Sequence, residues 1–183
     1  MQSLQGYLLI ALPALNDPNF FHSVVLIVQH NSEGVLGVIL NRPMETSIGQ
    51  AWTKVAEEPY DNEAPLFQGG PCSSPLAVLH NQESASDVHV CPGIHFTMQG
   101  PSIFSLVKDK ASPIRFFIGN SGWSPDQLEG EIREGSWMIA PARREHVFGP
   151  CENLWQDLSR QTTQDAIWPW IKPVAVPSDP SMN

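Results

Sequence analysis

The part of the sequence best suited to binding chemistry is a glycine-rich stretch between two regular elements. Residues 119–129 read GNSGWSPDQLE and follow the apolar run 114–118. Glycines let a backbone approach a ligand closely, and the free amides at a helix start can hold an anion. Ser124 has the position of an N-cap, and Gln127 has the position that closes a capping box. The stretch therefore predicts a strand, a loop and a capped helix, with Trp123 in a pocket wall.

The same stretch also has a purely structural interpretation. Ser124 and Gln127 would already satisfy some of the helix amides, and Asp126 places a negative charge where an anion would lie. No lysine or arginine falls inside the loop, so the pattern differs from a nucleotide-binding P-loop. Both interpretations stay open: a ligand site, or a strand-to-helix turn that Trp123 anchors in the core.

Cys72 follows Gly69-Gly70-Pro71, a segment whose residue types demand a specific irregular path. An exposed thiol on such a loop could act as a nucleophile or as a redox group. His30 and His80 are the candidate bases, although the sequence identifies no definite partner. A buried, structural thiol is the alternative interpretation.

Asn41-Arg42-Pro43 ends an apolar strand pattern. An arginine at a strand end can clamp a carboxylate or a phosphate with two parallel hydrogen bonds. It can equally pair with one of the many acidic residues of the chain, and we favour this structural pairing.

His89, Cys91 and His95 fall on a predicted hairpin, where positions 89 and 91 share one face. Imidazole and thiolate are zinc ligands, so the three side chains could converge on a metal ion. The chain has neither the CxxC nor the HExxH spacing, and no fourth ligand is evident. We therefore expect no metal centre, and no motif calls for a cofactor.

Periodicity and turn residues indicate the elements that must position these side chains. Short apolar runs predict strands, and the turns at 30–34 and 92–93 join two pairs of them as hairpins. Ser47 and Gln50 have capping-box spacing at a helix start. Hairpins interrupted irregularly by helices favour the α+β class. The predicted strands are 7–12, 23–29, 35–40, 65–68, 76–80, 88–91, 94–98, 114–118 and 137–140, and the predicted helices are 48–56, 101–109, 152–160 and one that begins at 125.

Size and composition indicate one globular domain. The 183 residues fit a single domain, which we place at 1–161, followed by a proline-rich, extended or disordered tail at 162–183. The net charge of −9 repels phosphate backbones and disfavours nucleic acid as a partner. No apolar run approaches the roughly 18 residues of a membrane span. The odd number of widely spaced cysteines and the lack of a signal-peptide pattern favour a cytoplasmic protein with free thiols.

Short motifs along most of the chain point to one family. They include Gly6–Ala11, Asn41-Arg42-Pro43, Gly69-Gly70-Pro71, Gly122-Trp123, Gln127-Leu128-Glu129 and Ser136-Trp137. On these motifs the chain resembles the YqgE/AlgH family of bacterial proteins. The resemblance implies a single compact α+β domain with a curved, mixed, mostly antiparallel sheet, partly barrel-like and flanked by helices. It implies no agreed catalytic residues, and some members carry the label of transcriptional regulator. Asn120-Ser121 depart from the aromatic-small pair that the family typically has there.

The sequence leaves three hypotheses for the function. We favour a non-enzymatic protein that binds an unidentified protein partner or small ligand, because no complete catalytic set is visible. A thiol-dependent enzyme or redox protein using Cys72 is the second hypothesis, and a transcriptional regulator, implied only by the family label, is the third. A cleft formed jointly by the marked segments would support binding. The candidate ligand-binding residues are Asn41, Arg42, Gly69, Gly70, Cys72, Gly119, Gly122, Trp123 and Gln127.

Overall fold

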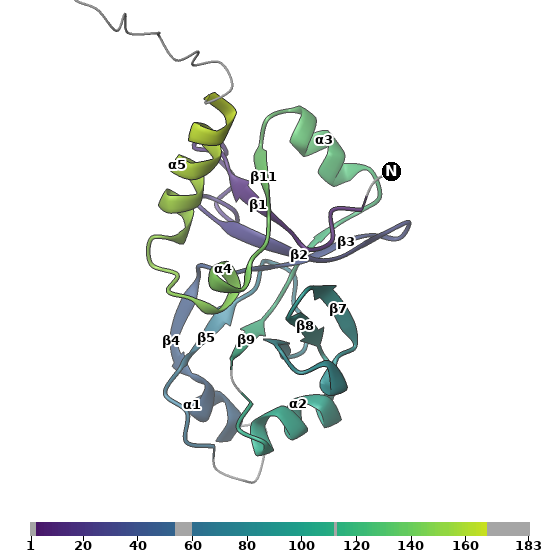
Figure 1. Cartoon of the computed structure of the whole chain (residues 1–183), viewed down its shortest axis with the longest axis vertical. Helices are drawn as coiled ribbons and strands as arrows, with labels where there is room; N and C mark the ends of the chain where they lie inside the picture. The colour runs from purple at the N-terminus through teal and green to yellow at the C-terminus, as the bar shows by residue number, and fades with distance from the viewer. Residues whose placement is uncertain (1–2, 54–59, 112, 168–183) are drawn as a thin grey trace, which may run out of the picture.

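Two β-sheets form the centre of the chain, which the computed structural model describes over residues 3–53, 60–111 and 113–167. The five-stranded sheet lies in the upper half of Figure 1 and the six-stranded sheet in the lower half. In spatial order the first sheet contains β10 (Ser121–Trp123), β3 (Gly34–Ile39), β2 (Val24–Asn31), β1 (Tyr7–Ala11) and β11 (Trp137–Pro141). The second contains β4 (Pro43–Ser47), β5 (Pro65–Gln68), β9 (Ile114–Ile118), β6 (Ala77–His80), β8 (Ile94–Thr97) and β7 (Val88–Cys91).

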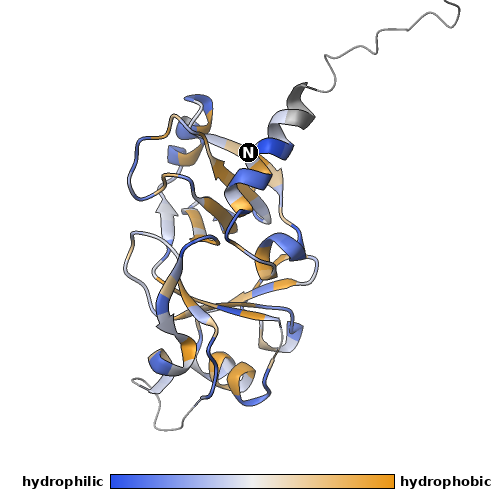
Figure 2. Cartoon of the chain, turned by 90° about the vertical axis from the view of Figure 1, so that its left-hand side faces the viewer, coloured by the Kyte–Doolittle hydropathy of each residue, from blue (hydrophilic) through white to orange (hydrophobic). Residues whose placement is uncertain are grey.

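The central strands of each sheet are apolar on both faces because both sides of the sheet are covered there. In β1, Leu8 and Ile10 point into the layer between the sheets, while Leu9 and Ala11 point outward under helix and loop residues. This alternation follows from the two-residue repeat of a strand. Figure 2 shows hydrophobic residues on the strands and on parts of the helices, with hydrophilic residues on turns and on the remaining parts of the helices. One central hydrophobic cluster takes residues from both sheets, so the sheets form one domain.

Helices cover the outer faces and one edge. On the outer face of the six-stranded sheet lie α1 (Ile48–Thr53) and α2 (Gly100–Lys108), near the short 3₁₀ helix η1 (Glu83–Ala85). On the outer face of the five-stranded sheet lies α3 (Gln127–Arg133), which buries Leu128. At the edge between the sheets lie α4 (Arg144–Phe148) and α5 (Leu154–Ile167), which contribute Val147, Leu154 and Leu158 to the central cluster. No helix in the described ranges is long and apolar enough to cross a membrane.

The α+β class and the mixed, mostly antiparallel pairing are confirmed. The strands β5 and β9 run parallel, and every other recorded strand pair is antiparallel. Both predicted hairpins are present, as β2–β3 and β7–β8. The expected single curved sheet is divided in two, and neither described sheet closes on itself. The Ser47–Gln50 capping box is also present, with amide-to-side-chain distances of 3.3 and 3.2 Å.

Several boundaries differ from the sequence predictions. The turn of the first hairpin is Ser32-Glu33 rather than five residues, because pairing continues to Asn31 and Gly34. The segments that form β4, β10 and α4 were not predicted as regular elements. The last helix continues to Ile167 and so enters the segment expected as tail. The prolines that would stop a helix begin only at residue 169. Residues 168–183 of the predicted tail lie outside the described residues. Residues 54–56 of the first predicted helix also lie outside them.

Candidate functional site

The stretch 119–129 is a crossing between the two sheets. β9 ends at Ile118 in the six-stranded sheet, and β10 begins at Ser121 in the five-stranded sheet, where it pairs with β3. The predicted helix start was two residues too early, because Asp126 adopts a left-handed conformation with φ of 65° and α3 begins at Gln127. Ser124 does not cap the helix: its hydroxyl donates to Gln127 Oε1 at 3.0 Å, and its amide donates to the same oxygen at 3.1 Å.

The glycines of this crossing pack against the Gly69–Cys72 segment, backbone on backbone. Cys72 and Asn120 exchange two backbone hydrogen bonds of 2.9 and 3.0 Å. A Cβ placed on Gly69 would lie 2.2 Å from the carbonyl oxygen of Gly119, and one on Gly70 would lie 2.3 Å from that of Asn120. The two predicted segments therefore converge, and the close contact between their backbones explains their glycines.

Cys72, Gly122 and Trp123 line an open depression of about 390 Å³ beside the β2–β3 hairpin. Trp123 is nearly buried, and its indole Nε1 donates to Glu131 at 3.0 Å. Its ring also stacks on Phe20 at a centroid distance of 5.6 Å. These contacts account for Trp123 as a core residue, and its part in a ligand site stays a prediction.

Asn41 and Arg42 hold the preceding turn in place. The Asn41 side chain accepts the amide of Val24 at 2.9 Å and donates to the carbonyl of His22 at 2.8 Å, which fixes the left-handed His22. Arg42 donates to the carbonyl of Phe21 at 3.4 Å. The expected ion pair of Arg42 with an acidic residue is absent among the described residues.

The two histidines considered as bases for Cys72 have other partners. In His30, Nδ1 accepts the Leu4 amide at 3.1 Å, and Nε2 lies 3.3 Å from a Glu129 carboxylate oxygen. His80 is fully buried on β6, and its Nδ1 accepts a backbone amide two residues further on. Cys72 itself is exposed. Its role as a nucleophile or redox group stays a prediction.

Three histidines lie at one register level across β6, β8 and β7. His80 pairs with His95, and His95 pairs with His89, with ring centroids 5.9 and 5.1 Å apart. Burial, followed by the neighbouring His95, lowers the pKa of His80 to about 4. Cys91 lies against the backbone of Gly6. In the part of the chain that the structure describes, no three potential ligands are placed to hold a metal ion.

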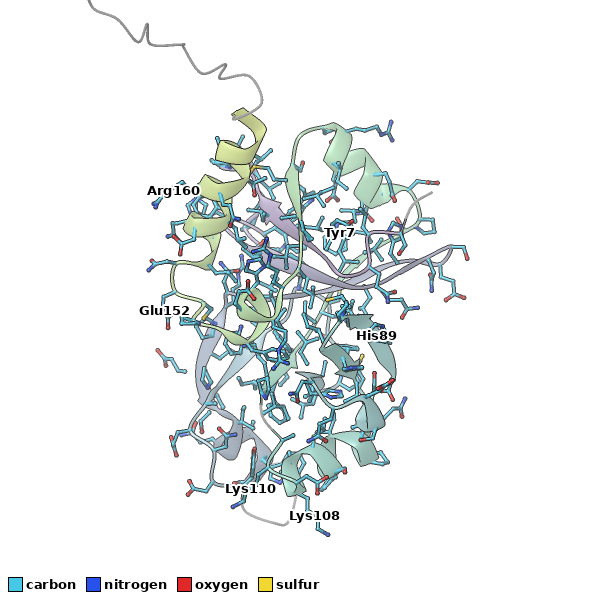
Figure 3. The ribbon with its side chains drawn as sticks, in the orientation of Figure 1. Tyr7, His89, Lys108, Lys110, Glu152 and Arg160 are labelled. Atoms are coloured by element: carbon cyan, nitrogen blue, oxygen red, sulfur yellow. The ribbon has the colours of Figure 1, made fainter. Side chains whose placement is uncertain are left out.

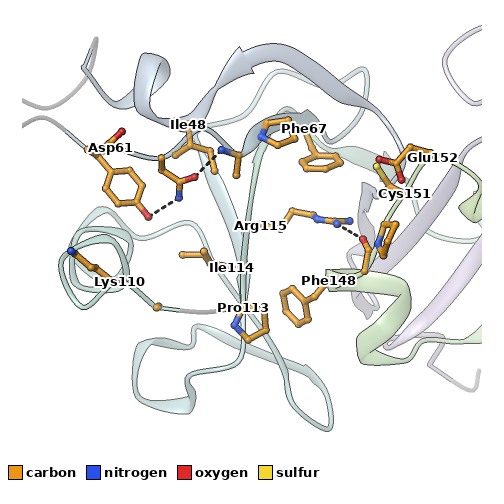
Figure 4. A pocket seen from close by; sticks show the side chains of 17 residues that line it. Ile48, Asp61, Phe67, Lys110, Pro113, Ile114, Arg115, Phe148, Cys151 and Glu152 are labelled. Atoms are coloured by element: carbon orange, nitrogen blue, oxygen red, sulfur yellow. Dashed lines mark hydrogen bonds between the residues drawn. The ribbon is translucent and has the colours of Figure 1, made fainter.

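A cavity of about 870 Å³ opens at the edge of the layer between the sheets, and its volume is more than twice that of the depression beside Cys72. Its position follows from the fold: β5 and β9 form one wall, and the connection from α4 to α5 forms the opposite wall (Figure 4). None of the nine predicted binding residues lines it. The lining residues are Ile48, Tyr60–Asn62, Ala64, Pro65, Phe67, Lys110, Ala111, Pro113–Arg115 and Phe148–Glu152.

Arg115 is the central polar side chain of this cavity. Its terminal nitrogen Nη2 donates to the carbonyl of Gly149 at 2.7 Å, and the second terminal nitrogen, Nη1, donates to the carbonyl of Leu40 at 3.4 Å. The guanidinium carbon lies 4.5 Å above the ring centre of Phe67, a cation–π contact. Register places Arg115 there, because it shares a strand face with Phe117, which pairs with Phe67.

Charges of both signs line the cavity. Lys110 and Glu152 lie at its opposite ends, as Figures 3 and 4 show. Burial lowers the pKa of Arg115, and the nearby Cys151 and Glu152 act in the opposite direction. No carboxylate forms an ion pair with Arg115 within the described ranges. The partly buried Arg115 guanidinium therefore contacts neutral carbonyl groups and an aromatic ring. A guanidinium in such surroundings is prepared to receive an anion.

Sequence reasoning missed this cavity because it treated residues 114–118 as an uninterrupted apolar run. The signal was an arginine inside a strand whose other four residues are two isoleucines and two phenylalanines. Arginine is rarely buried without a partner, so its place on an inward face marks a candidate site.

Comparison with known proteins adds the family to this geometry. The sequence profile described as AlgH-like matches residues 8–166. A UPF0301 protein of Streptomyces coelicolor is 37% identical across the whole chain and is itself covered to 97%. One from Chlorobaculum tepidum is 40% identical, with 82% of each chain covered.

Two solved structures share the fold. The solution structure of the AlgH protein from Pseudomonas aeruginosa has a TM-score of 0.74 at 21% identity, covering 94% of this chain and 97% of the other. The crystal structure of a protein from Corynebacterium diphtheriae has a TM-score of 0.72 at 25% identity, covering 88% of each chain. The names of these relatives state no substrate or reaction. On the profile match and these identities, the chain belongs to the AlgH-like family.

Proposed function

We propose that this chain is a cytoplasmic, non-enzymatic protein that binds a small organic ligand in the Arg115 cavity. The observation that supports this most is a guanidinium without a carboxylate partner in the described structure, set in a concave site of about 870 Å³. Ligand sites typically have volumes of roughly 300–1,000 Å³, mostly apolar walls and a few converging polar groups.

The walls fit this pattern. Ile48, Phe67, Ile114 and Phe148 offer apolar surface, and Arg115 offers the polar anchor. The rim includes a hydrogen bond of 2.9 Å between Asn62 and the Tyr60 hydroxyl. We assign no covalent step to this cavity: burial raises the pKa of the Cys151 thiol, which favours its unreactive, protonated form.

The test is a fragment screen by protein NMR with a variant that fills the cavity. Ala64 lines the cavity and is itself exposed, so Ala64→Trp should obstruct the space without disturbing the core. Glu63→Trp is the matched control, because Glu63 is also exposed but does not line the cavity. Fragments should shift amide signals of 113–115 and 148–152, and Ala64→Trp alone should abolish the shifts. Binding that maps elsewhere, or that survives Ala64→Trp, would contradict the proposal.

A further inference from the structure

The hydrogen-bonding capacity of Arg115 exceeds what the protein offers it. A guanidinium has five N–H donors in a planar fork, and two carbonyl oxygens accept from it here, one of them at the long distance of 3.4 Å. Carbonyl oxygens are neutral dipoles, and no carboxylate among the described residues forms an ion pair with the guanidinium. A planar anion with two oxygens would use the remaining donors and supply the missing charge.

The charges around the cavity limit how negative that anion can be. Lys110 and Arg115 contribute two positive charges, and Asp61 and Glu152 contribute two negative ones, so the described lining is neutral in sum. Glu152 is close enough to raise the pKa of Arg115, and its carboxylate would repel a second negative charge at the guanidinium. A ligand with a single negative charge therefore fits better than a dianion such as a phosphate monoester.

The surfaces around the guanidinium indicate the rest of the ligand. Phe67 covers one face of the Arg115 guanidinium, and Ile114 and Phe148 add apolar surface to the same cavity (Figure 4). A flat apolar body would bury surface against these side chains while its acidic end meets the guanidinium. We infer that the cavity takes a monocarboxylate with an apolar, ring-containing body, held by its carboxylate on Arg115. This inference rests on the proposed function, because it names the ligand class of the same site.

The experiment compares two probes of one shape, 2-naphthoate and its neutral analogue 2-naphthamide, by titration calorimetry and NMR. Charge-assisted hydrogen bonds are worth about 1.5–3 kcal/mol, so naphthoate should bind at least about tenfold more tightly than naphthamide. Naphthyl phosphate, a dianion near neutral pH, should bind more weakly than naphthoate. Equal affinities for naphthoate and naphthamide, or tighter binding of the phosphate, would overturn the inference.

Variants identify the anchor. Arg115→Met should remove the preference for naphthoate while leaving naphthamide binding intact, which also shows that the variant is folded. Arg115→Lys keeps a charge without the fork and should retain only part of the preference. Arg143→Met, at an exposed arginine outside the cavity, should change neither affinity.

The two proposals fail in different ways. If naphthamide binds in the cavity as tightly as naphthoate, the ligand class is wrong but the binding function stands. If Ala64→Trp leaves the binding of both probes unchanged, the cavity is not the site and both proposals fall. If Arg115→Met does not fold, the wild-type comparison of the three probes together with Arg115→Lys still decides the ligand class.

Discussion

Replacing Gly69 with alanine tests whether the glycine-rich segments serve backbone packing rather than a ligand. The added Cβ would lie 2.2 Å from the carbonyl oxygen of Gly119 and 3.2 Å from its carbonyl carbon. Real Cβ atoms essentially never come within 3.0 Å of such an atom, so either the segment around Gly69 or the segment around Gly119 must move by close to an ångström. No flexible side chain is available to absorb this shift, because the opposing atoms are backbone.

The loss of stability follows from the hydrogen bonds that hold the Gly69 segment in place. Gly69 donates to Ile118 at 2.8 Å and accepts from the amide of Ile39 at 2.9 Å and from the Ser121 hydroxyl at 3.2 Å. Overpacking costs about 1–3 kcal/mol, and a weakened hydrogen bond adds about 0.5–1.5 kcal/mol. We expect Gly69→Ala to lower the free energy of unfolding by about 2–4 kcal/mol, measured by urea denaturation followed by circular dichroism.

Gly130→Ala is the matched control, because it makes the same chemical change inside α3 where no atom lies within 4 Å of the new Cβ. It should stabilise the protein by about 0.5–1 kcal/mol, since alanine has the higher helix propensity. A Gly69→Ala protein as stable as the wild type would refute the packing argument. If that variant also lost ligand binding, the glycine-rich segments would return as the better candidate site.

Two further predictions concern polar groups that are partly or fully buried. Glu131→Ala should lower the free energy of unfolding by about 2–4 kcal/mol, because the indoles of Trp123 and Trp137, which donate to one Glu131 oxygen at 3.0 and 2.8 Å, both lose their acceptor. Glu131→Gln keeps a carbonyl oxygen as an acceptor and should lose less free energy of unfolding in the same urea assay. Equal losses in the two variants would contradict the role of Glu131 as the acceptor of both indoles. In the unfolded chain His80 takes up a proton near its ordinary pKa of 6.5, whereas in the folded protein it does so only near 4. Protonation of His80 therefore favours the unfolded state, and the free energy of unfolding should fall as the pH drops from 6.5 towards 4, by about 2 kcal/mol at pH 5. His80→Asn should reduce that pH dependence in urea titrations at pH 7.5 and 5, and an unchanged slope would show that another group carries it.

The Ser47–Gln50 capping box, both hairpins and the glycine at the end of α3 were all predictable from the sequence. Gly135 has φ of 78°, and the amides of Gly135 and Ser136 bond back to α3 as expected for a left-handed helix cap. Each of these features is indicated by turn or capping residues that lie only a few positions apart. Local backbone preference and short-range hydrogen bonds therefore decide them.

The path of 119–129 was only partly predictable. Asp126 in its left-handed conformation delays α3 by two residues, which Ser124 and Pro125 did not indicate. The three residues of β10 form a strand only because β3 lies beside them, and β3 is more than 80 positions earlier in the chain. Pairing of such short segments is a property of the assembled sheet rather than of their own sequence.

Motifs spread along the chain were enough to identify the family. Periodicity, capping residues and turn residues act over a few positions, and they were enough to predict the α+β class and most of the elements. The tertiary structure alone decided what the candidate residues do. It packed Gly69 and Gly70 against the Gly119 crossing and engaged Asn41 and Gln127 in turns. It also placed Arg115 at the edge of the intersheet layer, beside a cavity whose walls come from four separate segments. Contacts between distant segments carry no local signature. The sequence marked Arg115 only as an unusual strand residue, and its cavity formed when β5, β9 and the connection from α4 to α5 came together.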